Sequence, residues 1–189
     1  MSRRNSTGII LAVIIIASLA FYAGFRLGQT QVQQVPPATQ QAKCIKLEVI
    51  NDGDYYPKLL DLISKANKSI YVSMYEFKSD TSEVSRVLEL LISKAKKGVD
   101  VKVVLENTID VNELTYRRLL DGGVPVRFDT RSRTTHTKLI IIDGYIVIVG
   151  SHNWSYSAFT RNHEASILVY DEDVARQETE YFMQIYSGN

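Results

Sequence analysis

The chain has 189 residues, of which 45% are hydrophobic and 23% are charged, and its formal net charge is +1 at pH 7. This composition excludes a disordered chain, and the length allows one domain of ordinary size with an appendage. The single cysteine, Cys44, excludes an internal disulfide framework and a zinc site built from paired cysteines. Cys44 is expected to be an inert thiol, with cross-linking of two chains or attachment of a lipid as the alternatives.

The N-terminal 28 residues differ in kind from the rest. Residues 8–25 are uncharged, and as a helix they would extend about 27 Å, close to the hydrocarbon thickness of a bilayer. Arg3 and Arg4 outnumber Arg26 on the far side, which places the N-terminus in the cytoplasm. The sequence therefore predicts a transmembrane signal anchor over residues 1–28, in a single-pass membrane protein whose remaining residues lie outside the cytoplasm.

Two further features concern this N-terminal part. Ser18 and Ala20 are small residues at the positions that a signal peptidase reads, but Phe21 and Tyr22 favour an uncleaved anchor, and cleavage would give a secreted protein. Residues 29–42 carry glutamines and a Pro-Pro pair without apolar periodicity. We predict that they form a flexible linker, and that a folded domain occupies residues 43–189.

The pattern of apolar residues in this domain alternates between the strand and helix periods. It predicts strands over residues 45–50, 69–77, 99–106, 124–128, 137–143, 145–151 and 163–171, and helices over residues 54–66, 81–98, 110–123 and from about 173. Asp143-Gly144 is typical of a tight hairpin, which makes the sheet mixed. We therefore expect an α/β fold with a mixed central sheet and helices on both of its faces.

Polar residues gather at one end of the predicted hairpin. His136 and Lys138 are two apart at the start of a strand, so their side chains point to the same side. The return strand of the hairpin brings Gly150, Ser151 and Asn153 back beside them. A phosphate diester needs such parts: a nitrogen in line with the leaving oxygen, and a cation with neutral donors on the oxygens where charge grows. Phosphoryl transfer is the chemistry that this cluster predicts.

The spacing of these residues resembles a known motif. The pattern His136-x-Lys138-x4-Asp143-x6-Gly150-Ser151-x-Asn153 is similar to the HKD motif of the phospholipase D superfamily. With Asn162 and Glu164 downstream and "SMYEF" upstream, the chain most resembles the small bacterial endonucleases of that superfamily, which carry a single motif. The resemblance covers roughly residues 45–189 and implies the phospholipase D-like fold.

The resemblance implies a role for each residue of the motif. His136 would attack phosphorus to form a phosphohistidine, while Lys138 and Asn153 would hold the non-bridging oxygens with help from Ser151. Glu164 would orient and polarise the histidine. Asp143, at the turn, would have a structural or electrostatic part in the same motif.

The resemblance also implies an assembly. In the family a second motif supplies the histidine that protonates the leaving group, but this chain has one motif and no internal repeat. A homodimer is therefore implied, in which two copies of His136 meet in one composite site. No metal and no other cofactor would be required.

The sequence disfavours two other types of site, a zinc site and a serine hydrolase. A zinc site is disfavoured because the histidines lack metal-binding spacing and Lys138 lies among them. A Ser-His-Asp hydrolase is disfavoured because Ser151 lacks the Gly-x-Ser-x-Gly elbow. His152 is expected to face solvent, with contact to substrate as the alternative, and His163 is expected to be structural.

The substrate class stays open between nucleic acid and lipid. Of the 22 Lys and Arg, three arginines lie N-terminal to the domain, which leaves 19 against 21 acidic residues and a domain charge of about −2. A cluster of basic residues leads into the motif, and Arg131, Arg133 and Arg161 are candidate contacts to substrate phosphates. Trp154 is a further candidate, for base stacking, although core packing is its favoured role.

These observations favour a metal-independent endonuclease that cleaves DNA or RNA. A membrane-anchored phospholipase D or phosphatidyltransferase that acts on phospholipids is the first alternative. The second is a non-catalytic module that binds phosphate or nucleic acid, but such a module would be expected to have lost part of the motif.

Overall fold

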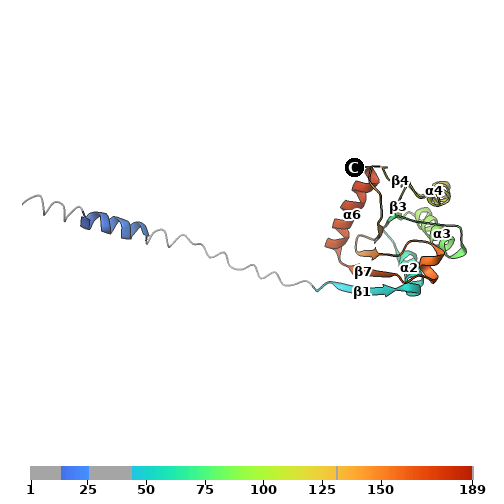
Figure 1. Ribbon diagram of the computed structural model, residues 1–189, viewed down its shortest axis with the longest axis horizontal. Helices are drawn as coiled ribbons and strands as arrows, with labels where there is room; N and C mark the ends of the chain where they lie inside the picture. The colour runs from blue at the N-terminus through green and yellow to red at the C-terminus, as the bar shows by residue number, and fades with distance from the viewer. Residues whose placement is uncertain (1–13, 26–43, 131, 189) are drawn as a thin grey trace, which may run out of the picture. The chain divides into compact units, whose positions relative to one another are not determined.

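The computed structural model describes residues 14–25, 44–130 and 132–188 (Figure 1). The chain divides into two units, residues 1–43 and 44–189, each of which is considered by itself. The predicted linker, residues 29–42, lies outside the described residues.

The N-terminal unit corrects the predicted location of the protein. Residues 14–25 form a helix, which at 1.5 Å per residue extends about 18 Å, against about 30 Å for the hydrocarbon core of a bilayer. Within the described ranges, no helix combines the length and the apolar character that crossing a membrane requires. The prediction of a single-pass membrane protein with an extracytoplasmic domain is therefore wrong. Residues 1–13 and 26–28 of the predicted anchor lie outside the described part.

A seven-stranded mixed sheet forms the centre of the second unit, in the order β1-β7-β6-β5-β2-β3-β4. Strands β2, β3 and β4 pair in parallel, and the other neighbours pair antiparallel. The strands are β1 (Lys46–Asn51), β2 (Ser69–Met74), β3 (Asp100–Leu105), β4 (Val126–Phe128), β5 (Lys138–Ile142), β6 (Ile146–Gly150) and β7 (Ala165–Tyr170). The predicted mixed sheet is present.

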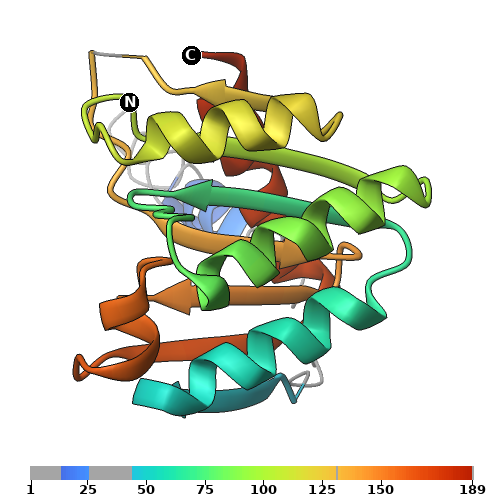
Figure 2. The ribbon, with the colours of Figure 1, turned by 90° about the vertical axis from the view of Figure 1, so that its right-hand side faces the viewer.

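Helices lie on both faces of the sheet. Figure 2 shows α2 (Tyr55–Lys65), α3 (Ser82–Lys96) and α4 (Asn112–Asp121) across one face, and α6 (Glu172–Ser187) behind the other. Two short elements were not predicted from the sequence, the 3-10 helix η1 (Asp52–Asp54) and the helix α5 (Tyr156–Thr160). The helix α5 lies between Asn153 and Glu164 in the chain, and Asp52 of η1 forms hydrogen bonds with the backbone of Glu164.

Strand β5 explains the apolar run that follows the motif lysine. Its residues are all buried, because β5 lies at the middle of the sheet and is covered on both faces. Ile140 and Ile142 pack in the larger core with α2 and α3, whereas Leu139 and Ile141 pack with Phe182 of α6. The run is therefore a central strand. Its N-terminal end is polar and lies where the strands of the sheet end.

The β5–β6 hairpin fixes the other end of this strand. Asp143 and Gly144 have φ values of 55° and 65°, the left-handed conformation of a tight turn in which the Tyr145 N–H donates to the Ile142 carbonyl at 3.0 Å. The Asp143 carboxylate accepts hydrogen bonds from the backbone N–H groups of Asn67 (3.0 Å), Lys68 (2.7 Å) and Ser69 (3.0 Å). These bonds tie the hairpin to the loop before β2.

Candidate active site

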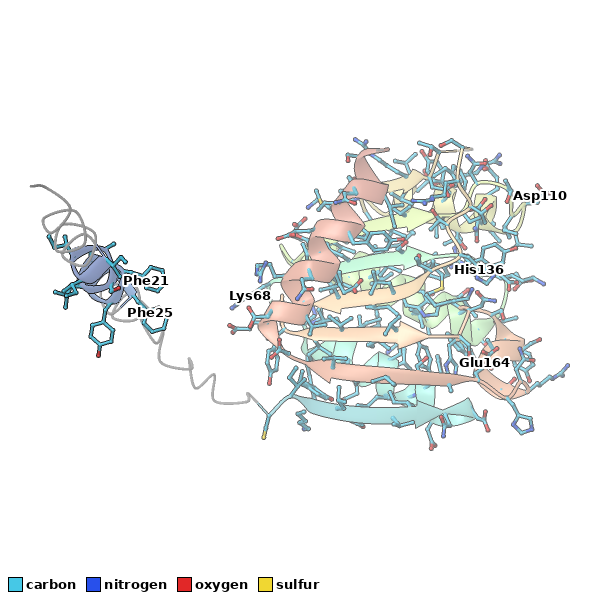
Figure 3. All side chains as sticks on the ribbon, turned by 60° about the vertical axis from the view of Figure 1, so that its left-hand side comes forward. Phe21, Phe25, Lys68, Asp110, His136 and Glu164 are labelled. Carbon is cyan, nitrogen blue, oxygen red and sulfur yellow. The ribbon has the colours of Figure 1, made fainter. Side chains whose placement is uncertain are left out.

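His136 and Lys138 lie side by side at the N-terminal end of β5. The Lys138 ammonium is 3.3 Å from Nδ1 and 3.5 Å from Nε2 of His136, and it donates to the His136 carbonyl at 3.1 Å. The imidazole is exposed while Lys138 is only 7% exposed. Figure 3 shows His136 at the same end of the sheet as Glu164, with Lys68 at the opposite end. The predicted juxtaposition of these two side chains is thus present.

Strand β2 holds the pair in place. Thr137, the residue between them, accepts a backbone hydrogen bond from Tyr75 at 2.9 Å, and its hydroxyl lies 2.5 Å from that of Ser73. The Tyr75 ring lies 4.4 Å from the His136 ring and 4.8 Å from the Lys138 ammonium. Tyr75 therefore backs both side chains. The sequence reasoning did not assign it a part, although it belongs to the "SMYEF" stretch of the family resemblance.

The charge of Lys138 depends on its surroundings. Burial lowers the pKa of Lys138 below its ordinary value, and the charges of Glu164 and Glu76 oppose this shift. A buried ammonium that keeps its charge at neutral pH is less hydrated than a surface lysine, so its attraction for a phosphoryl oxygen is stronger.

Ser151 and Glu164 form a second part of the site, on the arm that returns from the hairpin. The Ser151 backbone N–H donates to the Ala165 carbonyl at 2.9 Å, and its hydroxyl donates to the Glu164 carboxylate. The Asn162 amide donates to the other Glu164 oxygen at 3.0 Å. Within the described residues no hydrogen bond joins Glu164 to His136, so the orienting contact that the resemblance implies is not made inside one chain.

Asn153 borders a polar hollow between the segments that follow β2 and β6. The hollow has a volume of about 360 Å³ and is lined by Glu76, Lys78, Asp80, Thr81, Asn153, Ser155, Tyr156, Ser157 and Asn162. The Asn153 side-chain oxygen is buried and has no hydrogen-bond partner in the described part of the chain. Its amide group is positioned by the loop that follows β6, on the same side as Glu76.

A cavity of about 300 Å³ opens on the other side of His136. It lies between the loop that leads into β5 and the C-terminal part of α6, and it is lined by Asp129, Thr130, Arg133, Thr134, Thr135, His136, Thr137, Tyr181, Gln184, Ile185 and Gly188. Arg133 is the cation that shares this lining with His136. The cavity thus offers a positive charge and several hydroxyl groups next to the candidate nucleophile.

Two buried carboxyl groups hold the loop that carries His136. Glu106 and Asp129 are 1% and 8% exposed, and both accept the Thr135 backbone N–H, at 2.6 Å and 3.1 Å. Burial and the neighbouring Glu106 raise the pKa of Asp129, while hydrogen bonds from Thr108 and Thr135 outweigh burial and lower that of Glu106. Glu106 and Asp129 directly follow the buried strands β3 and β4, and this position is the sequence signal that indicates the pair.

Three predicted substrate contacts can now be placed. Arg133 lines the cavity, and Arg161 is exposed with its guanidinium 5.0 Å from the Tyr156 ring centre. Trp154 is 0% exposed, lies edge-on to Phe77 and donates to the Tyr55 hydroxyl at 3.1 Å. The predicted stacking of Trp154 on a substrate is therefore wrong, because no face of the ring is accessible, and its favoured role of core packing is the one observed. Arg131 lies outside the described residues.

The other two histidines and Asp143 lie apart from the pair of His136 and Lys138. His152 is fully buried, so the expectation that it faces solvent is wrong. His163 is fully exposed, and its Nδ1 lies 3.3 Å from the Asp52 carboxylate, so its structural role stays a prediction. Asp143 lies at the far end of β5 from His136, where it binds the backbone before β2. It is thus in the motif but not beside the pair.

The comparisons with known proteins agree with this geometry. Residues 59–186 match the family described as "Cardiolipin synthase, PLD-like domain". Over 130 residues the chain is 33% identical to a cardiolipin synthase of Staphylococcus aureus, an alignment that covers 66% of this chain and 25% of the relative. Over 136 residues it is 32% identical to the mitochondrial cardiolipin hydrolase of Xenopus tropicalis, covering 69% of this chain and 62% of the relative. The chain thus spans about a quarter of the length of the synthases that it matches.

Solved structures with the same fold are also found. Nuc from Salmonella typhimurium, a phospholipase D family member, superposes with a TM-score of 0.66 at 25% identity, covering 76% of this chain and 96% of that one. NucT from Helicobacter pylori superposes with a TM-score of 0.64 at 22% identity, covering 77% of this chain and 98% of that one. The second likeness concerns the fold alone.

Proposed function

The chain belongs to the phospholipase D superfamily, and on that premise we propose that it is a phosphodiesterase whose substrate is DNA or RNA. The observation that carries the proposal is the contact between His136 and Lys138, at 3.3 Å, beside a cavity that contains Arg133. Endonucleolytic cleavage, without a required metal ion, is the reaction that this arrangement fits best.

The proposed reaction has two displacements. A His136 nitrogen attacks phosphorus, an N–P bond forms, and the bond from phosphorus to the leaving oxygen breaks as that oxygen takes a proton. Water then attacks phosphorus, and its proton passes to a general base while the N–P bond breaks and releases His136. Lys138 neutralises the charge on the non-bridging oxygens, with Asn153 and Ser151 as neutral donors in this account.

The leaving oxygen needs an acid, and among the described residues no second histidine lies beside His136. Of the other histidines, His152 is buried and His163 is exposed beside Asp52 on the side of Glu164. We therefore propose that a second copy of His136 gives the proton, in a homodimer with one composite site. No hydrogen bond joins Glu164 to its own His136 in the described part of the chain, so its carboxylate is proposed to polarise a histidine of the assembled site.

An exposed apolar face supports the homodimer. Helix α6 contacts β2, β3, β5 and β6, and Figure 3 shows no helix in front of β7 and β1 on this side. The side chains left exposed there are Leu47 (60%), Val49 (67%), Val149 (48%) and Ile167 (42%). Val49 pairs with Ile167 and Ile167 with Val149, so they form one continuous patch.

The patch reaches the active site, because Val149 is followed by Gly150 and Ser151. Helix α6 also exposes Tyr181 (42%) and Met183 (39%). A second copy of the chain, seated on this patch, would bury apolar side chains of both and bring a second site close to the first. The continuity of the patch with the site is what points to a copy of this chain as the occupant.

Nucleic acid is the favoured substrate for two reasons. Arg133 and Arg161 flank the site as exposed cations that suit successive phosphates of a polynucleotide. The superposition also covers nearly the whole of Nuc, whereas the match to the cardiolipin synthases covers a quarter of their length. A phospholipid is the second candidate, supported by the cardiolipin synthase and hydrolase relatives and by Tyr181 and Ile185 in the cavity wall.

The test compares substrates on the full chain in excess EDTA. Single-stranded DNA, double-stranded DNA, RNA and cardiolipin vesicles are assayed in parallel, with His136→Ala as the control. The proposal expects cleavage of nucleic acid that persists in EDTA and disappears in the variant. Hydrolysis of cardiolipin alone would replace the nuclease by the second candidate, and binding without cleavage would indicate the non-catalytic module.

The dimer is tested with a charge placed in the patch. Val49→Lys is expected to give a monomer by sedimentation and to lose most turnover, because the composite site is not assembled. Leu120→Lys is the matched control, since Leu120 is 54% exposed on α4, which covers the other face. A monomeric Val49→Lys that keeps full turnover would reject the composite site.

A further inference from the structure

His152 lies between two residues of the site but turns away from it. Ser151 is exposed, whereas the His152 side chain is 0% exposed. Its ring stacks on the Tyr55 ring, with centroids 4.0 Å apart and planes 8° from parallel. The reaction proposed above gives no role to this buried imidazole, although it lies directly behind the site.

The hydrogen bonds of His152 define its tautomer. Its Nε2 is 3.2 Å from the Asp52 carbonyl oxygen, which can only accept, so Nε2 carries the hydrogen. Its Nδ1 is 2.8 Å from the Ser166 hydroxyl, which then donates to the free lone pair. Burial lowers the pKa of His152, against the Asp52 carbonyl and the charges of Glu164 and Asp52. The neutral ring is thus the form that satisfies both partners.

Asp52, the first partner, holds the backbone of Glu164 on both sides. The Asp52 N–H donates to the Glu164 carbonyl at 2.9 Å, and the Glu164 N–H donates to the Asp52 carboxylate at 2.8 Å. Asp52 has a φ of 49°, a left-handed conformation that is less favourable than the right-handed one for a residue with a Cβ and that local contacts stabilise. The bond from His152 to the Asp52 carbonyl is one such contact.

Ser166, the second partner, lies two residues beyond Glu164. It pairs with Gly150 across β6 and β7, next to Ser151, whose hydroxyl donates to the Glu164 carboxylate. Asp52, Ser151 and Glu164 also line one shared hollow. The ring of His152 therefore bridges the two backbone segments that fix where the Glu164 carboxylate lies.

We propose that His152 is a positioning residue, which holds Glu164 in place through Asp52 and Ser166. The inference rests on the proposed function for the reaction that Glu164 serves. It assigns His152 no contact with substrate. It predicts that the contacts of His152 with Asp52 and Ser166 matter for turnover, more than the packing of its ring.

Two replacements separate these contacts from packing. His152→Phe keeps the stack on Tyr55 and removes both hydrogen bonds, and His152→Gln keeps an N–H that can reach the Asp52 carbonyl. We expect His152→Phe to lower kcat about 10- to 100-fold, with KM within about threefold, and His152→Gln to restore part of kcat. Phe159→Leu is the matched control, because Phe159 packs on the same Tyr55 ring, and its side chain cannot form hydrogen bonds with Asp52 or Ser166.

A double-mutant cycle tests whether the effect passes through Glu164. In the Glu164→Gln background, His152→Phe is expected to cause little further loss of kcat, because the carboxylate that it positions is already gone. An equal loss in both backgrounds would overturn the proposal, as would a loss in Phe159→Leu as large as that in His152→Phe.

Amide hydrogen exchange gives a readout that does not depend on turnover. The Glu164 N–H is expected to exchange about tenfold faster in His152→Phe than in Phe159→Leu, after each rate is compared with that of Ile140 in the central strand. Unchanged exchange at Glu164 would overturn the proposal. If the wild-type chain cleaved nothing, the proposed function would fail, and this arm would still decide whether His152 holds Glu164.

Discussion

Gly150 is the position where a single methyl group should affect both fold and site. A Cβ there would lie 2.2 Å from the Ser166 hydroxyl oxygen, 2.3 Å from the Ala165 carbonyl oxygen and 2.5 Å from the Ser166 Cα. Two of these three atoms are backbone, so a rotamer change cannot relieve the contact. Gly150→Ala must therefore push β6 away from β7, by roughly 1 Å if ordinary van der Waals contact is to be restored.

The cost can be estimated from two contributions. Overpacking of this kind costs typically about 1–3 kcal/mol, and weakening the hydrogen bond from the Ser151 N–H to the Ala165 carbonyl adds about 1 kcal/mol. The free energy of unfolding should therefore fall by about 2–4 kcal/mol. For a domain of this size that corresponds to a decrease in Tm of roughly 5–15 °C. Turnover should fall as well, because Ser151 and Glu164 flank the displaced pair of strands.

The assay is thermal and urea unfolding of Gly150→Ala beside Gly53→Ala. Gly53 is the matched control, because a Cβ there meets nothing closer than the Phe159 carbonyl oxygen at 3.9 Å. A Gly150→Ala chain as stable as Gly53→Ala, within about 0.5 kcal/mol, would refute the reasoning.

Two further predictions concern ionisable groups. Burial alone would raise the pKa of Asp143, but the three backbone N–H bonds outweigh it and lower the pKa; the stability that they give is present above the unfolded value near 3.8 and is lost as the pH falls through the folded value. The free energy of unfolding of Asp143→Asn should therefore decrease less with falling pH than that of the wild type. The same pH dependence in both chains, followed by circular dichroism at acid pH, would contradict this. Burial lowers the pKa of Lys138, so kcat/KM should fall as alkaline pH removes the ammonium. Lys138→Arg should shift this decrease in kcat/KM to higher pH. A decrease at the same pH would show that another group causes it.

The sequence predicted the sheet well where the pattern was local. The alternation around β5 and the turn at Asp143-Gly144 predicted the hairpin, and the pairing of Leu139 with Val149 brings Gly150 to the same end of the sheet as Lys138. The juxtaposition of His136 with Lys138 could also be predicted, because the two residues are only two positions apart in the extended segment that leads into β5.

The sequence failed where non-local packing decided the outcome. His152 follows a strand in a polar stretch, yet it is buried, because its ring stacks on Tyr55 of α2 and its Nε2 bonds to the Asp52 carbonyl of η1. The hydrogen bonds from the Thr135 N–H to Glu106 and Asp129 join the ends of two strands to a separate loop. Such contacts depend on the fold and not on a local pattern. The membrane prediction rested on the length of the uncharged segment, residues 8–25, and the described helix covers only residues 14–25 of it.

The most direct test of the central claim is to trap the covalent intermediate on His136. Labelled substrate is mixed rapidly with the full chain, the reaction is quenched in base, and the labelled residue is located by mass spectrometry. The account predicts an acid-labile phosphoramidate on His136 that forms and decays at the rate of turnover and is absent in His136→Ala. Turnover without any label, or label on a different residue, would contradict it.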